Sequence, residues 1–415
     1  MSRLVYKNFF FLFIVQFSNY VLPFLVIPLL TRALGLDGFG KYAFYIGIGN
    51  LLLVFIRFGF EFSATRQISI ESENKERVGQ IVGAVLAIKT CLLVLTLAVF
   101  YLVVFILKPD VQHNILMLGG MFLLSGQMML PVWFFQGMQQ MKFVTFYTVV
   151  TKIVYVGLLF LFIRDTSDYG LATVVYGCGF FIAGAISLIH VFKAVPVSFP
   201  TWLLIKDTFK EALPFFSSRV FIMSYTSAMI PLIGFIGTPA QAAIYAASEK
   251  LYNAAQSVMY PLANALYPHV AKNKDLSLYK RLFLIAMVVV LFGGVIGYFV
   301  APVIIEFLFG SEFKASADIF SIHLVALVFL FPSMMLGFPL LAALGFSKEA
   351  NGVVIVGALV FFAIALYGYL SGIVDSQYFV WGVVAAECTV FVLRAYFAKT
   401  RVFNHLAQFS KKEPV

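Results

Sequence analysis

The chain has 415 residues, of which 62% are hydrophobic and only 12% are charged, and its formal net charge at pH 7 is +10. Because soluble domains carry about 25% charged residues, this composition excludes a soluble globular protein. Apolar runs of roughly 20 residues, long enough to cross a bilayer as helices, recur along the whole chain. Their continuity excludes a barrel of short alternating strands. The sequence therefore predicts an all-α polytopic membrane protein.

The first apolar run follows Arg3 and Lys7 and is too long for the core of a signal peptide, so it predicts a retained span. Pro332 and Pro339 predict a kink in the tenth span. Twelve transmembrane helices are expected in chain order, at 8–30, 42–63, 80–107, 115–136, 142–163, 169–192, 212–237, 239–265, 280–305, 315–344, 349–370 and 375–398.

Lysine and arginine gather on one side of these spans, which sets the orientation. With the amino terminus inside, the outer segments hold only Arg32, Lys41, Lys108, Arg164 and Lys314. The inner segments hold many more, namely Arg3, Lys7, Arg66, Lys75, Arg77, Lys142, Lys193, Lys206, Lys210, Lys272, Lys274, Lys280, Arg281, Lys348, Lys399, Arg401, Lys411 and Lys412. We therefore expect both termini in the cytoplasm. This inner excess explains the basic net charge without a nucleic-acid partner.

The long inner connection 193–211 divides the spans into two sets of six. The expected domains are an N-terminal six-helix bundle (1–192), a cytoplasmic linker (193–211), a C-terminal six-helix bundle (212–398) and a cytoplasmic tail (399–415). Aligning Ile27–Leu30 (IPLL) with Ile230–Ile233 (IPLI) also places Tyr42 over Tyr245, which is consistent with a parallel repeat. Transporters built from such repeats hold their substrate between the two halves.

Charged residues inside the spans are the candidate site. A charge in the membrane costs roughly 2.5–3.5 kcal/mol on the insertion scale, so it pairs or faces a wet cavity. The basic residues outnumber the acidic ones: Arg57, Lys89, Lys152, Arg219, Lys250 and Arg394 stand against Glu61, Glu249 and Glu387. Lys89, Lys152 and Lys250 fall near mid-membrane and the arginines in the cytoplasmic half. This pattern predicts a cationic funnel open to the cytoplasmic leaflet, suited to an anion such as phosphate.

Structural interpretations stay open for several of these residues. Arg57 and Arg394 are close enough to the interface to snorkel, and Arg57 also reaches Glu61 one turn on. Glu61 and Glu249 are candidates for gating or proton coupling, with stabilising pairing as the alternative. His323 is interpreted as a packed polar residue. No metal-ligand or cofactor motif and no catalytic constellation is apparent, so no enzyme, cofactor or metal is expected.

Four stretches carry a resemblance to a known family. They are QFSNYVLPFLVIPLLTRALGLDGFGKYAF (Gln16–Phe44), FGFEFSATRQIS (Phe58–Ser69), PVWFFQGMQQMKF (Pro131–Phe143) and YPLANALYPHVAK (Tyr260–Lys272). With the length and the span pattern, they resemble the O-antigen flippases (Wzx-type) of the multidrug/oligosaccharidyl-lipid/polysaccharide exporter superfamily.

The resemblance implies two six-helix bundles around a central cavity in the bacterial inner membrane. It implies translocation of an undecaprenyl-pyrophosphate-linked oligosaccharide to the periplasmic leaflet, for O-antigen and lipopolysaccharide biosynthesis. Family members that handle anionic glycans have cationic lumens, which fits the intramembrane lysines and arginines. The polymerase and chain-length proteins of the same pathway are the expected protein partners, besides membrane lipid.

Two other functions compete with the flippase as interpretations of this sequence. A multidrug exporter of the same fold typically needs acidic groups for ion coupling, but the first span offers Gln16 and Asn19 and no carboxylate. Asn19 is a candidate gating or coupling residue because it is a polar residue of this first span. A membrane-embedded glycan polymerase or ligase tends to have a large outer loop, whereas every expected outer loop here is short.

Overall fold

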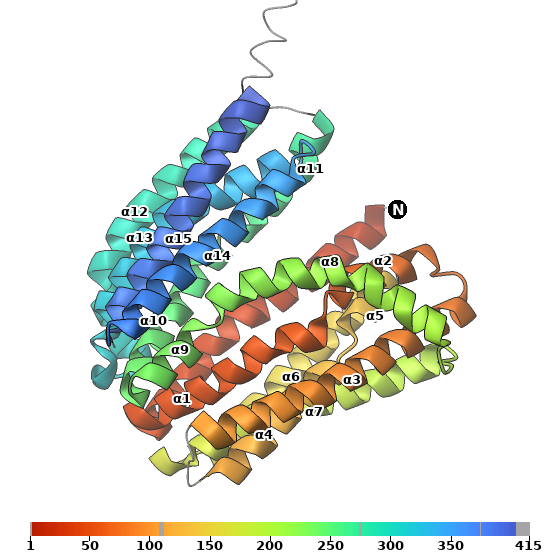
Figure 1. Cartoon of the computed structure of the whole chain (residues 1–415), viewed down its shortest axis with the longest axis horizontal. Helices are drawn as coiled ribbons and strands as arrows, with labels where there is room; N and C mark the ends of the chain where they lie inside the picture. Colours follow the sequence, from red (N-terminus) through yellow and green to blue (C-terminus); the bar gives the residue numbers. More distant parts are fainter. Residues whose placement is uncertain (1, 108–111, 274–275, 374, 404–415) are drawn as a thin grey trace, which may run out of the picture. The chain divides into compact units, whose positions relative to one another are not determined.

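A computed structural model describes residues 2–107, 112–273, 276–373 and 375–403, with side chains described from residue 26 onward apart from a few positions (Figure 1). Throughout these ranges the regular structure is helical and no strand occurs. The all-α prediction is therefore confirmed. The chain divides into two compact units, Met1–Met223 (unit 1) and Ser224–Val415 (unit 2).

Unit 1 contains the first six expected spans. Gly35 leaves the helical region (φ 63°) inside α1 and separates the first two spans. The fourth span is broken at Leu130 and Pro131, where the backbone is not helical. Its elements are α1 (Ser2–Arg57), α2 (Phe60–Ile70), α3 (Lys75–Leu107), α4 (His113–Met129), α5 (Val132–Gly137), α6 (Met141–Phe162), the short helix η1 (Thr166–Asp168), α7 (Tyr169–Ala194) and most of α8 (Trp202–Thr226).

Helices α4 and α7 run side by side in unit 1 (Figure 1), and glycines allow their close approach. A Cβ atom added to Gly126 would collide with the Phe181 backbone nitrogen, and one added to Gly184 would lie 2.5 Å from the Gly126 carbonyl oxygen. Because apolar side chains gain little by leaving lipid, such small-residue contacts are the usual means of joining membrane helices.

Unit 2 contains the eighth to twelfth expected spans and the second half of the seventh, because the boundary between the units falls inside α8. In the tenth span, the α-helix gives way after Met335 to a π-helix that contains Pro339 and lies just beyond Pro332, so the predicted irregularity is present. The elements of unit 2 are α9 (Met229–Ile236), α10 (Pro239–Ser257), α11 (Tyr260–Asn273), α12 (Leu276–Phe309), η2 (Ser311–Phe313), α13 (Ser316–Met335), the π-helix η3 (Leu336–Ala342), α14 (Ser347–Leu370), α15 (Ser376–Phe397) and η4 (Ala398–Phe403).

Nine helices in the described ranges are long and apolar enough to cross a membrane. This number is roughly consistent with twelve spans, because Val26–Ile70 counts once and covers the second expected span together with the end of the first. The seventh and eighth expected spans are divided into shorter pieces, α8 with α9 and α10 with α11. They break at Ser227–Ala228 and at Val258–Met259.

The segment 193–211, which the sequence predicts to be a linker, packs against unit 1. Its second half is the start of α8, and Glu211 accepts a hydrogen bond of 2.6 Å from the Gln67 side chain of α2. The Phe209 ring stacks on Phe58 at 4.7 Å between centroids. Because these contacts fasten the segment to unit 1, the boundary between the compact units falls later, between Met223 and Ser224.

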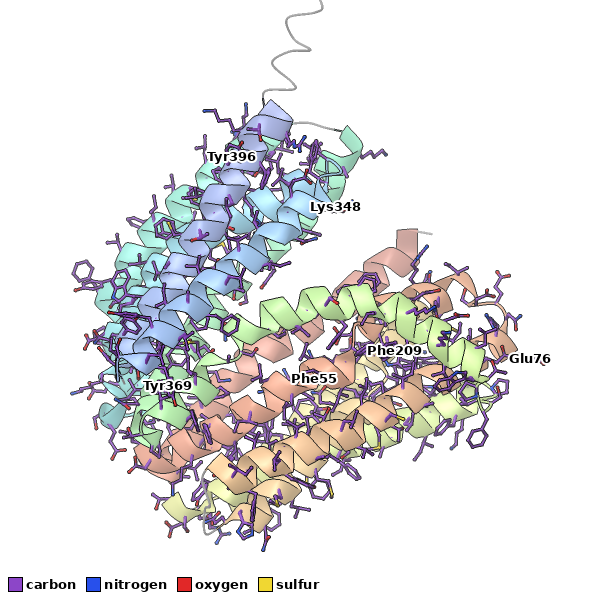
Figure 2. The ribbon with its side chains drawn as sticks, viewed as in Figure 1. Phe55, Glu76, Phe209, Lys348, Tyr369 and Tyr396 are labelled. Carbon is purple, nitrogen blue, oxygen red and sulfur yellow. The ribbon has the colours of Figure 1, made fainter. Side chains whose placement is uncertain are left out.

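Large apolar side chains cover the outside of both units, as expected for helices in lipid. Figure 2 shows Tyr369 and Tyr396 at opposite ends of unit 2, and both are exposed. Tyrosine concentrates at the two membrane–water interfaces, so this placement is consistent with unit 2 spanning the bilayer between them.

Candidate functional site

The break between α1 and α2 lies directly against α8. Phe58 and Gly59 both have positive φ, 43° and 77°. A Cβ atom on Gly59 would lie 2.6 Å from the Phe215 Cβ, so only glycine fits this approach. Phe58 stacks on Phe216 at 4.4 Å, and Figure 2 labels Phe209 on α8 in this part of unit 1. Side chains on either side of the break are thereby brought to α8.

Glu61 lies between two arginines at this break. Its carboxylate is 3.7 Å from Arg57 Nε and 3.7 Å from Arg219 Nη2, and these three residues form the Glu61 cluster. Direct charge-assisted hydrogen bonds are about 2.7–2.9 Å, so both ion pairs are loose. The three side chains are 34–42% exposed. One carboxylate shared by two guanidinium groups leaves a positive surplus on the surface of unit 1.

The Arg219 guanidinium also lies over the Phe62 ring, 5.2 Å from its centroid. Phe62 in turn stacks on Phe215 at 5.6 Å between ring centroids, and the two residues are 47% and 40% exposed. A cation held over an aromatic face keeps its charge available on the open side. The Glu61 cluster therefore combines exposed cations with exposed aromatic rings.

Lys89 extends the positive region inward. This residue of α3 is only 3% exposed, and its Nζ donates to the Gln127 carbonyl oxygen at 3.5 Å. Its ammonium group interacts electrostatically with Glu61 and Arg57. The structure thus brings together Arg57, Glu61, Arg219 and Lys89, four of the predicted site residues.

The other predicted residues lie elsewhere. Lys152 is half-buried on α6 of unit 1. Glu249 is half-buried and Lys250 is exposed on α10, both in unit 2. Asn19 belongs to α1, but its side chain lies outside the described residues.

Arg394 has a structural role in unit 2. Its guanidinium donates to the Ala350 carbonyl oxygen at 2.8 and 3.1 Å, and to the Ser333 carbonyl oxygen and hydroxyl at 3.0 and 3.1 Å. These bonds tie α15 to α14 and to α13 next to the π-helix. Arg394 therefore joins three helices through hydrogen bonds and does not extend to the membrane interface, which was the alternative interpretation.

His323 is packed inside unit 2, as the sequence indicated. It is 1% exposed, its Nδ1 is 2.7 Å from the Ser248 hydroxyl, and its ring stacks on Tyr252 at 4.7 Å between centroids. This residue therefore joins α13 to α10.

A tyrosine cluster in unit 1 was missed by sequence reasoning. The Tyr42 and Tyr155 hydroxyls are 3.1 Å apart, and Tyr176 packs edge-on to both rings. Tyr176 also interacts electrostatically with Arg57. The three residues come from α1, α6 and α7, and no local spacing in the sequence connects them.

Comparisons with known proteins agree on the family. Residues 5–274 match the family described as "Polysaccharide biosynthesis protein". The chain is 29% identical over 282 residues to a "Putative O-antigen transporter" of Escherichia coli (strain K12), covering 67% of this chain and 68% of that protein. It is 27% identical over 360 residues to a protein of the same name from Shigella dysenteriae, covering 85% and 90%.

Solved structures share the fold. A multidrug resistance MATE family transporter of the MOP superfamily in its inward-facing conformation has a TM-score of 0.69 at 12% identity, covering 94% of this chain and 99% of that one. An outward-facing conformation of a multidrug resistance MATE family transporter has a TM-score of 0.58 at 13% identity, covering 94% and 95%. The resemblance inferred from the four sequence stretches is confirmed, and the chain is a multi-pass membrane protein that belongs to the polysaccharide biosynthesis protein family.

Proposed function

We propose that this protein is a flippase that moves undecaprenyl-pyrophosphate-linked oligosaccharide units, such as O-antigen repeats, from the cytoplasmic to the periplasmic leaflet of the bacterial inner membrane. Its family and the transporter names of its relatives support transport rather than enzymatic chemistry. The polymerase and chain-length proteins of the same pathway would receive the product.

The observation that carries the proposal is the Glu61 cluster with Lys89 beneath it. Arg57 and Arg219 come from different helices yet converge on one carboxylate at 3.7 Å each. Guanidinium groups suit phosphate oxygens because each presents a fork of parallel N–H donors. A pyrophosphate in place of the Glu61 carboxylate would satisfy both arginines at once.

The proposed path starts at the Glu61 cluster and continues to the deeper cations. Lys89 and Lys152 of unit 1 and Lys250 of unit 2 would then hold the head group in a cationic lumen while the lipid tail stays in the bilayer. Alternating access between two six-helix bundles would release it on the outer side, where fixed cations are few. Glu61 and Glu249, with Asn19, are the proposed gating or coupling residues.

The test is surface-glycan display in a strain that lacks its own copy of the gene. Arg57→Gln combined with Arg219→Gln is expected to reduce display at least tenfold at equal protein level, because two charge-assisted contacts of about 1.5–3 kcal/mol each are lost. Arg281→Gln is the matched control, since Arg281 is exposed and lies outside the proposed path.

Unchanged display in the double variant would overturn the cationic path. If the native chain fails to restore glycan display in this strain but raises the strain's tolerance to cationic drugs, the protein is instead a multidrug exporter.

A further inference from the structure

The connection between α7 and α8 is pressed against α3. A Cβ atom on Gly79 would collide with the Pro196 carbonyl oxygen, and one on Gly83 with the Ser198 carbonyl oxygen. The two glycines lie one turn apart on the same face of α3. The backbone of the connection is therefore held against α3 of unit 1. This packing also fixes the direction in which its side chains point.

This fixed segment presents apolar side chains outward. Phe199 is fully exposed, and Trp202 and Leu203 at the start of α8 are 78% and 67% exposed. The opposite face of α8 is packed inward, with Thr208 and Ala212 buried. Aromatic side chains bury about 150–250 Å² each when they are covered, so a rigid outward placement fits an apolar environment better than water.

Two lysines share this outward face. Lys206 and Lys210 are exposed and follow Trp202 at intervals of one helical turn. Asp207 is also exposed and borders this face, about 100° from Lys206 and about 60° from Lys210, so the face keeps a net positive charge. Tryptophan anchors helices at the level of lipid head groups, and lysine extends from there toward phosphates.

We propose that Phe199–Lys210, the interfacial segment, inserts Phe199, Trp202 and Leu203 among the head groups of a phospholipid leaflet, and that Lys206 and Lys210 bind phosphates of anionic lipids. Protein–protein interfaces are depleted in lysine, so the mixed Trp–Leu–Lys face fits a lipid surface better than a protein partner. This inference is independent of the transported substrate.

Trp202 is a built-in reporter for the test. The chain has three tryptophans, and Trp133 is buried in unit 1 while Trp381 is half-exposed on α15. The full-length protein is reconstituted in vesicles of phosphatidylcholine with or without phosphatidylglycerol, with iodide on both sides of the membrane. The difference in fluorescence between the native chain and Trp202→Phe isolates the Trp202 emission.

We expect Trp202 to be quenched strongly by lipids brominated near the head group and weakly by iodide. Lys206→Gln with Lys210→Gln should raise iodide quenching about twofold or more in the phosphatidylglycerol vesicles and little in phosphatidylcholine alone, because each lysine adds attraction to an anionic surface. Lys348→Gln, an exposed lysine of unit 2, should change nothing.

Strong iodide quenching of Trp202 in both kinds of vesicle would overturn the inference. Shielding from iodide without any quenching by brominated lipid would also overturn it and would identify a protein partner or a second copy as the occupant.

Discussion

The Glu61 carboxylate lies 3.7 Å from both Arg57 and Arg219, so under the proposed function it competes with the phosphate for these two side chains. Glu61→Gln should therefore tighten binding of a short-chain polyprenyl diphosphate by roughly twofold to fivefold, because an exposed ion pair is worth up to about 1 kcal/mol. Titration calorimetry on the full-length protein in detergent measures this change.

Glu306→Gln serves as the control for Glu61→Gln, since Glu306 pairs with Lys314 in unit 2 at 3.3 Å. If Glu61→Gln leaves the affinity unchanged while Arg219→Gln lowers it, the carboxylate is no competitor of the diphosphate.

Arg394 is expected to stabilise the packing of helices in unit 2. Arg394→Met removes the donors to the Ala350 and Ser333 carbonyl oxygens and should lower the free energy of unfolding by about 2–3 kcal/mol. Arg394→Lys should recover only part of this loss, since an ammonium group cannot reproduce the planar fork. Thermal unfolding in detergent provides the measurement. An unchanged Tm with lost glycan display would instead place Arg394 on the substrate path.

At the scale of elements, the contact between α4 and α7 depends on glycine. Gly184→Leu should destabilise unit 1 by about 1–3 kcal/mol or prevent its folding, because the added side chain meets the Gly126 carbonyl oxygen. Gly157→Leu on α6 is the matched control, since a Cβ atom there meets nothing within 4 Å. Size-exclusion chromatography after graded heating compares the two, and equal loss of folded protein in both would refute the packing argument.

For the whole molecule, the distribution of basic residues predicts which side of the membrane each connection faces. Alkaline phosphatase fused after Glu312 should be active in the periplasm, whereas fusions after Lys348 or at Val415 should be inactive. Fluorescent-protein fusions at the same positions should show the reverse pattern. Phosphatase activity at Val415 would contradict the cytoplasmic placement of the carboxyl terminus.

Several features followed from the sequence because their causes are local. A bilayer requires long apolar helices whatever their neighbours are, so composition and run length predicted the fold class and the span pattern. The irregular tenth span followed from its two prolines. The four-residue spacing also predicted the contact between Arg57 and Glu61, although the helix is broken between them at Phe58 and Gly59 and the two side chains meet across that break. Each of these depends on residues that are close in the chain.

Only the tertiary structure decided which distant side chains meet. Arg219 reaches Glu61 because the break at Gly59 fits against α8, and Arg394 fastens three helices through carbonyl oxygens that carry no sequence signature. The packing of residues 193–211 against unit 1 likewise depends on the glycines of α3. The sequence by itself determined that the chain is a helical membrane protein, whereas helix packing decided the partners of its charges, since those contacts depend on which helix faces meet.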